Sequence, residues 1–125
     1  CPEMGEHILR SYWSFERLVD PSGLAAIKRD TNAIEQKLAD HGSRKVNLDP
    51  GLLGTARFCL ATTKDRSHRI PLAGGIYAEL TLVFEHGEFR ALPWTYPDWA
   101  SEPVRRMLAE LRAGLLADLR RQDLL

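Results

Sequence analysis

The fold is decided by residues 76–84, which read Ile76-Tyr77-Ala78-Glu79-Leu80-Thr81-Leu82-Val83-Phe84. Apolar residues occupy alternate positions throughout this stretch, and a period of two predicts a β-strand. Because successive side chains of a strand point to opposite faces, we expect one face to be an apolar core face. The other face is then expected to carry Tyr77, Glu79 and Thr81.

Further strands are predicted on both sides of this stretch. His86-Gly87 predicts a two-residue turn, after which residues 89–94 return as a partner strand that ends near Pro93 or runs along a sheet edge. Upstream, residues 57–63 favour a strand over the end of a short helix. Residues 8–15, with three aromatic side chains, are typical of another strand.

Two amphipathic helices are predicted to flank the sheet. Asp20-Pro21 predicts the start of the first helix and His41-Gly42 its end, with Lys28 and Glu35 on a solvated flank. Its apolar face is expected to carry Leu24, Ile27, Ile34 and Leu38. After Asp98, the apolar stripe from Val104 to Leu119 predicts the second helix, with its arginines on other, solvated faces. The order of elements predicts an α+β fold with a mostly antiparallel sheet and a β-hairpin.

Length and composition set further bounds. The 125 residues predict a single domain, residues 1–125. Seventeen basic and seventeen acidic residues cancel, so neither nucleic acid nor an anionic membrane is an expected partner. No apolar run approaches the ~20 residues of a membrane-spanning helix, and no secretory signal is visible. Cys1 and Cys59 form no disulfide framework, which favours a cytoplasmic protein, and Cys59 is expected to be a small core residue.

Several blocks of the chain, in the same order, resemble an uncharacterised prokaryotic family catalogued as domain of unknown function 4416. The blocks are Glu3-Met4-Gly5, Ser14-Phe15-Glu16, Asp20-Pro21, Asn32 with Glu35, residues 47–51, 61–65, 68–70 and 75–79, and residues 94–98. The resemblance implies a further N-terminal strand and helix, so we expect the chain, which begins with Cys1, to be a fragment. Leu52, Pro71 and Trp99 stand where the family usually has tyrosine. No polar role is therefore assigned to Leu52 or Pro71.

The central blocks predict a site for an anion. Thr62 and Thr63 supply hydroxyl donors, Lys64 an ammonium group, Arg69 a guanidinium fork, and His68 a donor when protonated. These types of side chain bind phosphate groups, although the nucleotide-binding glycine-rich loops are absent from the sequence. Separate surface roles for the charged residues are the alternative, since such residues are mostly exposed.

A metal or acid–base site is a second hypothesis for the same region. Asp49, Asp65, His68, Glu79 and Asp98 are hard-ligand or proton-transfer types, so a divalent metal is conceivable, but no established metal spacing is present. The three aspartates have an alternative as caps and turn residues. Glu79, in mid-strand, would need Lys64 or Arg69 as a partner if it is buried. His68 and Glu79 are the candidate proton carriers.

Aromatic residues complete the predicted site. Trp94, Tyr96 and Trp99 either stack a ligand ring or plug the core where the last helix joins the sheet. Tyr77 and Tyr96 are expected to line the pocket, and Asn47 to contribute an amide. The sequence thus predicts a polar pocket for an anionic, phosphate-bearing small molecule or nucleotide. The alternative is a non-catalytic structural or protein-interaction domain in which the same polar groups form internal caps and ion pairs. Whether the protein is an enzyme stays open at this point.

Overall fold

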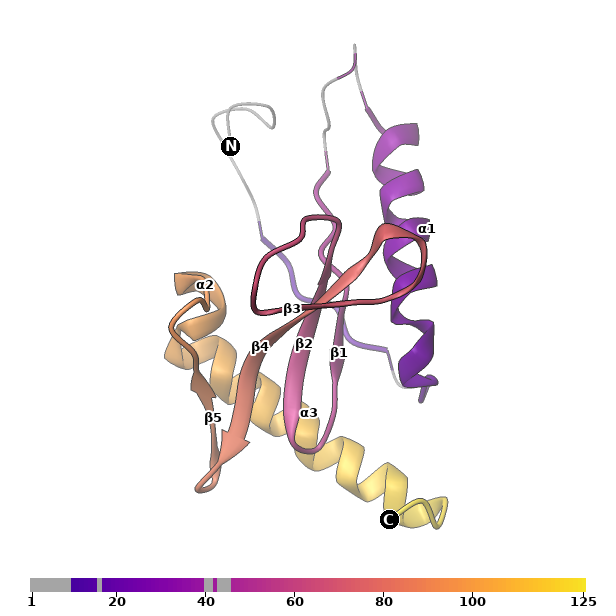
Figure 1. The fold of residues 1–125 in the computed structure, drawn as a ribbon. Coiled ribbons are helices and arrows are strands. Elements are labelled where there is room, and N and C mark those ends of the chain that lie inside the picture. Colours follow the sequence, from indigo (N-terminus) through magenta and orange to yellow (C-terminus); the bar gives the residue numbers. More distant parts are fainter. Residues whose placement is uncertain (1–9, 16, 40–41, 43–45) are drawn as a thin grey trace.

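A five-stranded antiparallel sheet organises the molecule, in the order β1-β2-β4-β3, with β5 also paired to β4 (Figure 1). The computed structural model describes residues 10–15, 17–39, 42 and 46–125. The strands are β1 (Gly51–Leu53), β2 (Arg57–Thr62), β3 (Arg69–Pro71), β4 (Tyr77–Glu85) and β5 (Glu88–Ala91). The predicted α+β fold with an antiparallel sheet and a hairpin is confirmed.

The central strand β4 has an interrupted edge. One edge pairs with β2, while the other pairs first with β3, at residues 77–79, and then with β5, at residues 82–85. Leu80 and Thr81 lie between these two ladders, without a strand partner on that edge in the described part of the chain. This break in the edge of β4 positions the candidate site described below.

An irregularity in β4 turns its apolar side chains from one face of the sheet to the other. Cys59 lies opposite Leu80 and Phe58 opposite Leu82, so Thr81 is an extra residue in β4. Such a bulge reverses the alternation of side chains beyond it. Leu82 accordingly packs in a core cluster with Leu108 of the last helix, whereas Ile76 packs in a separate cluster with Leu24 of the first helix. The prediction of one apolar face from Ile76 to Phe84 is therefore wrong.

The first helix, α1 (Leu24–Lys37), packs its start against Ala61 and Ile76. A short 3₁₀ turn, η2 (Pro21–Gly23), precedes it, and the Asp20 carboxylate accepts a hydrogen bond from the Ser22 backbone N–H at 2.9 Å. Backbone and side-chain hydrogen bonds from Ser22 lower the pKa of the Asp20 carboxyl. The helix ends at Lys37, before the predicted stop, and His41 lies outside the described residues.

The buried face of α1 differs from the predicted one. Lys28 and Glu35 are 8% and 4% exposed, whereas Ile34 and Leu38 are about half exposed. The chain segment before β1 explains this, because the Leu48 N–H donates to Glu35 Oε2 at 2.7 Å and the Leu48 carbonyl lies 3.5 Å from Lys28 Nζ. The order Asp49-Pro50-Gly51 is typical of a turn and predicts one here. This prediction is wrong, since the segment runs along α1 and Gly51 opens β1.

The second helix covers the other face. A short α2 (Pro97–Ala100) and α3 (Glu102–Arg121) are separated at Ser101, and α3 crosses obliquely behind the strands in Figure 1. Leu108 is the buried anchor of α3. Two arginines predicted to face solvent are half-buried instead. Arg105 donates to the Ala100 and Phe89 carbonyls, and Arg112 donates to the Thr55 carbonyl and lies 3.6 Å over the Phe84 ring. No helix among the described residues is both long and apolar enough to cross a membrane.

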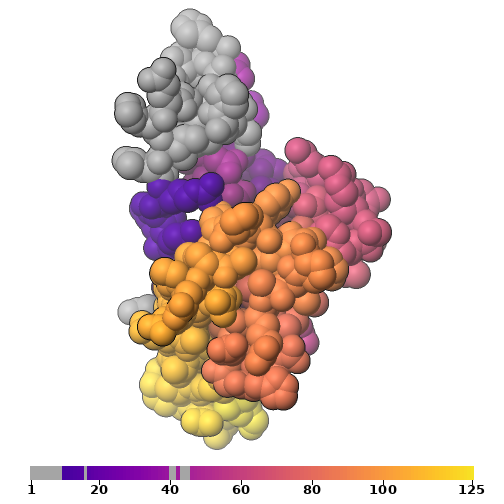
Figure 2. Space-filling view, turned by 90° about the vertical axis from the view of Figure 1, so that its left-hand side faces the viewer, coloured from indigo at the N-terminus to yellow at the C-terminus, as the bar shows by residue number. Residues whose placement is uncertain are grey.

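The predicted strand at residues 8–15 is not formed by its described part, residues 10–15, which has no regular secondary structure. Residues 8 and 9 lie outside the described chain. Arg10 forms an ion pair with Asp98, and the Tyr12 ring meets Trp99 edge-on with centroids 5.4 Å apart. Figure 2 shows these indigo residues lying against orange residues around α2. Side-chain contacts, not a sheet ladder, therefore hold this segment.

Substitution of Gly51 tests how closely β1 packs against β2. A Cβ atom at this position would lie 2.5 Å from the Phe58 ring and 2.9 Å from the Cys59 carbonyl oxygen. We expect Gly51→Ala to lower the free energy of unfolding by about 1–3 kcal/mol through overpacking. The matched control is Gly54→Ala in the same hairpin, where the nearest atom is 3.6 Å away. Urea denaturation of both variants checks this, and equal stabilities would contradict it.

Candidate functional site

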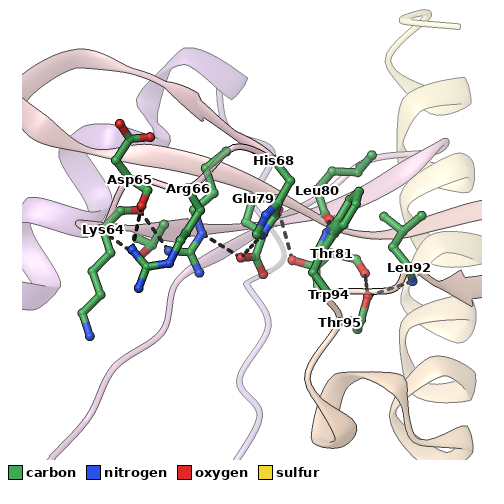
Figure 3. A network of polar contacts seen from close by, with 12 residues as sticks. Lys64, Asp65, Arg66, His68, Glu79, Leu80, Thr81, Leu92, Trp94 and Thr95 are labelled. Carbon is green, nitrogen blue, oxygen red and sulfur yellow. Dashed lines mark hydrogen bonds and ion pairs between the residues drawn. The ribbon is translucent and has the colours of Figure 1, made fainter.

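The candidate site is centred on Glu79, at the break in the edge of β4 (Figure 3). Glu79 is 3% exposed, and its Oε2 atom accepts a hydrogen bond from Arg69 Nε at 2.8 Å. The same oxygen lies 3.0 Å from His68 Nε2. Arg69 is directly opposite Glu79 in the β3–β4 register, which places their side chains on one face. Of the two partners predicted for a buried Glu79, Lys64 and Arg69, the structure shows Arg69.

Arg69 joins the buried carboxylate to the loop before β3. Besides Nε, its NH1 group donates to the Lys64 carbonyl at 3.0 Å, and its side chain is only 9% exposed. A guanidinium committed to two internal acceptors holds the loop in place and offsets the charge of Glu79. The structure therefore gives Arg69 an internal role in ordering the site.

His68 is held on two sides. Its ring stacks on Trp94, with centroids 4.6 Å apart and planes inclined by 22°, while Nε2 faces Glu79. Figure 3 shows the imidazole between the carboxylate and the indole. Its other nitrogen, Nδ1, has no hydrogen-bond partner among the described residues. The ring is thus fixed in orientation and retains one nitrogen for a ligand.

The turn after β5 closes the break in β4. Trp94 Nε1 donates to the Leu80 carbonyl at 2.7 Å, and Thr95 Oγ1 donates to the Thr81 carbonyl at 2.6 Å. Leu80 and Thr81 are the two residues of β4 that lie between the β3 and β5 ladders. The side chains of Trp94 and Thr95 thus supply the hydrogen bonds that a neighbouring strand would otherwise donate to these carbonyls. Thr95 was not predicted as part of this site, and Trp94 was predicted only as a stacking or core residue.

The loop from Thr62 to His68 carries the other cationic groups. Thr62 Oγ1 accepts a hydrogen bond from the Lys64 N–H at 3.2 Å, and Arg66 NH1 donates to the Asp65 carbonyl at 2.8 Å. The Lys64 ammonium has no partner among the described residues and points away from Glu79 in Figure 3. Residues 63–67 are all exposed. The loop therefore offers hydroxyl and ammonium donors to solvent beside the ordered His68.

The remaining predicted site residues lie in other contacts. The Asn47 amide donates to Asp49 at 3.0 Å, in the segment that runs along α1. Asp98 pairs with Arg10 and accepts from the Trp99 N–H, although Tyr96, not Asp98, is the N-cap of α2. Tyr77 is half-buried opposite Thr62 and Pro71, and Tyr96 is 61% exposed. Of the charged set, His68, Arg69 and Glu79 are in mutual contact, and Asp49 and Asp98 have other partners.

The three aromatic residues predicted to stack a ligand or plug the core, Trp94, Tyr96 and Trp99, have different surroundings. Trp99 packs on Phe58 in the core, with centroids 4.8 Å apart, and so plugs the junction of helix and sheet. Trp94 instead covers His68, and Tyr96 faces solvent. Only Trp94 is therefore placed to meet a ligand at His68.

Metal and thiol chemistry find little support in the described geometry. Within residues 10–15, 17–39, 42 and 46–125, no three His, Cys, Asp or Glu side chains gather closely enough to hold a metal ion. Cys59 is half-buried in β2 and belongs to neither core cluster, so it is not the core residue that was predicted, and burial raises the pKa of its thiol. A raised pKa keeps the thiol protonated, the less nucleophilic form.

Comparison with known proteins gives one match. A family model described as a domain of unknown function (DUF4416) matches residues 1–114. No curated protein and no solved structure matches the chain.

Proposed function

The chain belongs to the DUF4416 family of domains of unknown function, and we propose that it binds an anionic, phosphate-bearing small molecule or nucleotide at the loop that leads into His68. The observation that carries this proposal is the ordered imidazole. Its Nε2 is fixed by a buried carboxylate and its ring by Trp94, while Nδ1 has no partner in the described chain. A side chain oriented in advance loses little entropy when a ligand binds.

The charges around His68 support an anionic ligand. The charges of Arg69 and Glu79 offset each other, so the exposed loop is left with two cations, Lys64 and Arg66, and one anion, Asp65. The net charge of the loop is therefore positive, and protonation of His68 makes it more positive. Exposed hydroxyl and ammonium groups of residues 63 and 64 complete a set of donors without a buried counter-charge. We propose a cytoplasmic location as well, where phosphorylated metabolites are abundant.

The alternative is a non-catalytic structural or protein-interaction domain. It is favoured by the internal pairing of several predicted site residues, namely Glu79 with Arg69, Asn47 with Asp49, and Asp98 with Arg10. In that case His68 would serve to close the sheet edge. The two functions differ in one measurable respect, since only the first requires a small anion to stabilise the folded state.

A ligand screen tests the proposal. We expect inorganic phosphate, pyrophosphate or a nucleotide to raise the melting temperature saturably, compared with chloride at equal ionic strength. A ligand present at 100 times its Kd stabilises the folded state by about 2.7 kcal/mol. Lys64→Ala and His68→Gln are expected to reduce the rise, because each removes a donor.

Arg106→Ala is the matched control for charge. Arg106 is an exposed arginine on α3 whose partner is Glu102, so its removal changes the net charge without touching the loop. If this variant loses the response as fully as Lys64→Ala, the binding is a nonspecific charge effect. If none of the three ligands raises the melting temperature of the wild-type chain, the structural alternative holds.

A further inference from the structure

Arg69, Glu79 and His68 form a chain of contacts in which a carboxylate lies between two basic side chains. The guanidinium of Arg69 and the imidazole of His68 share one oxygen, Oε2, of Glu79. Because one arginine and one glutamate cancel, the charge of the three side chains together equals the charge of His68. The triad is neutral when His68 is neutral and carries one positive charge when His68 is protonated.

The geometry also limits how His68 can meet a ligand. With Nε2 directed at Glu79 and one ring face covered by Trp94, the contact left for a polar ligand is Nδ1. When Nε2 carries the proton that faces Glu79, a neutral imidazole presents only a lone pair at Nδ1, which repels an oxyanion. A protonated imidazole presents an N–H there instead.

We propose that the anion binds together with a proton on His68, an inference that rests on the proposed function. The site then binds a tetrahedral oxyanion only when His68 is in its imidazolium form. The bound state is then a line of alternating charges from Arg69 through Glu79 and His68 to the anion. Each contact in this line is a charge-assisted hydrogen bond, which is stronger than a neutral one.

Other charged groups near His68 do not replace this role. Arg69 of β3 and Glu79 of β4 are committed to each other, and the turn after β5 contributes the uncharged Trp94 and Thr95. The remaining titratable side chains of the surrounding elements are Lys64, Asp65 and Arg66 in the loop, Tyr77 and Glu85 on β4 and Tyr96 after the turn. None of these side chains forms a hydrogen bond, an ion pair or a ring contact with the His68 ring, whose described partners are Glu79 and Trp94. Histidine is the side chain that ordinarily changes charge between about pH 5 and 8.

Calorimetric titration with sulfate tests the proposal, because sulfate does not itself titrate near neutral pH whereas phosphate monoesters do. Binding enthalpies measured in buffers of different ionisation enthalpy give the number of protons taken up. We expect uptake to approach one proton at the alkaline end of the range from about pH 5 to 8, where histidine is ordinarily neutral, and to fall toward zero at its acid end. The Kd is expected to rise about tenfold per pH unit on the alkaline side. Phosphate titrated in parallel is expected to bind as well.

Two variants separate this inference from the proposed function. Lys64→Ala is expected to weaken binding but keep the proton uptake, whereas His68→Gln is expected to abolish the uptake. Sulfate binding without proton uptake at any pH, or phosphate binding without sulfate binding, would overturn the inference and leave the proposed function standing. The second result would mean that a neutral His68 accepts a hydrogen bond from the ligand. If neither anion binds, the proposed function fails together with the inference.

Discussion

Replacement of Glu79 by alanine is expected to lower the free energy of unfolding by about 3–5 kcal/mol. The Glu79 side chain is 5% exposed, and its removal leaves the Arg69 guanidinium, with a side chain only 9% exposed, without its ion-pair partner. An uncompensated buried charge is the costly part of such a change, and the pair itself contributes less. Urea denaturation monitored by circular dichroism measures the loss through the midpoint and the slope.

Two companion variants identify the cause of this loss. Glu79→Gln keeps an acceptor oxygen of similar shape, so its loss is expected to be smaller than that of Glu79→Ala. The double variant Glu79→Ala with Arg69→Leu removes both charges and is expected to be more stable than Glu79→Ala alone. A Glu79→Ala variant within about 1 kcal/mol of the wild type would show that water reaches Arg69 readily, contrary to the burial described.

Replacement of Phe89 by alanine is expected to lower the free energy of unfolding by about 3–5 kcal/mol. Phe89 is 1% exposed, packs in one cluster with Leu82 and Leu108, and meets the Phe84 ring edge-on at 5.1 Å. Its ring thus joins β5, β4 and α3. Removing it deletes buried apolar surface and leaves a cavity that a rigid sheet fills poorly. The same denaturation experiment measures the effect.

Phe15 provides the matched control for this change. It is also a phenylalanine but is 82% exposed, so Phe15→Ala is expected to change stability by no more than about 0.5 kcal/mol. Phe89→Leu, which retains much of the apolar volume, is expected to fall between Phe89→Ala and the wild type. If Phe89→Ala and Phe15→Ala were equally stable, the core between α3 and the sheet would not have the packing described.

The site shows where inference from the sequence reached its limit. The need of a buried Glu79 for a cationic partner could be predicted, because a charged residue in the middle of a strand is costly to bury alone. The sequence left Lys64 and Arg69 as alternatives, and the register of β3 with β4 decides for Arg69. Trp94 as the stacking partner of His68 was not predicted. The reason is that β3 and β5 share one edge of β4 and leave a gap, and the lengths of their ladders depend on pairings between distant segments. Thr95 was missed for the same reason.

Local patterns in the sequence by themselves determined the α+β class, the strand β4, its hairpin with β5 and the existence of both long helices. These features follow from periodicity and turn chemistry, which act over a few neighbouring residues. Only the tertiary structure decided which residues of β4 face each helix, because one bulge at Thr81 reverses the side-chain alternation of this strand. It also decided that Lys28 and Glu35 are buried. Asp49 pairs with Asn47, whereas His68 pairs with Glu79, so the two predicted site residues do not meet. Such outcomes depend on contacts between segments far apart in the chain, for which a local pattern carries no signal.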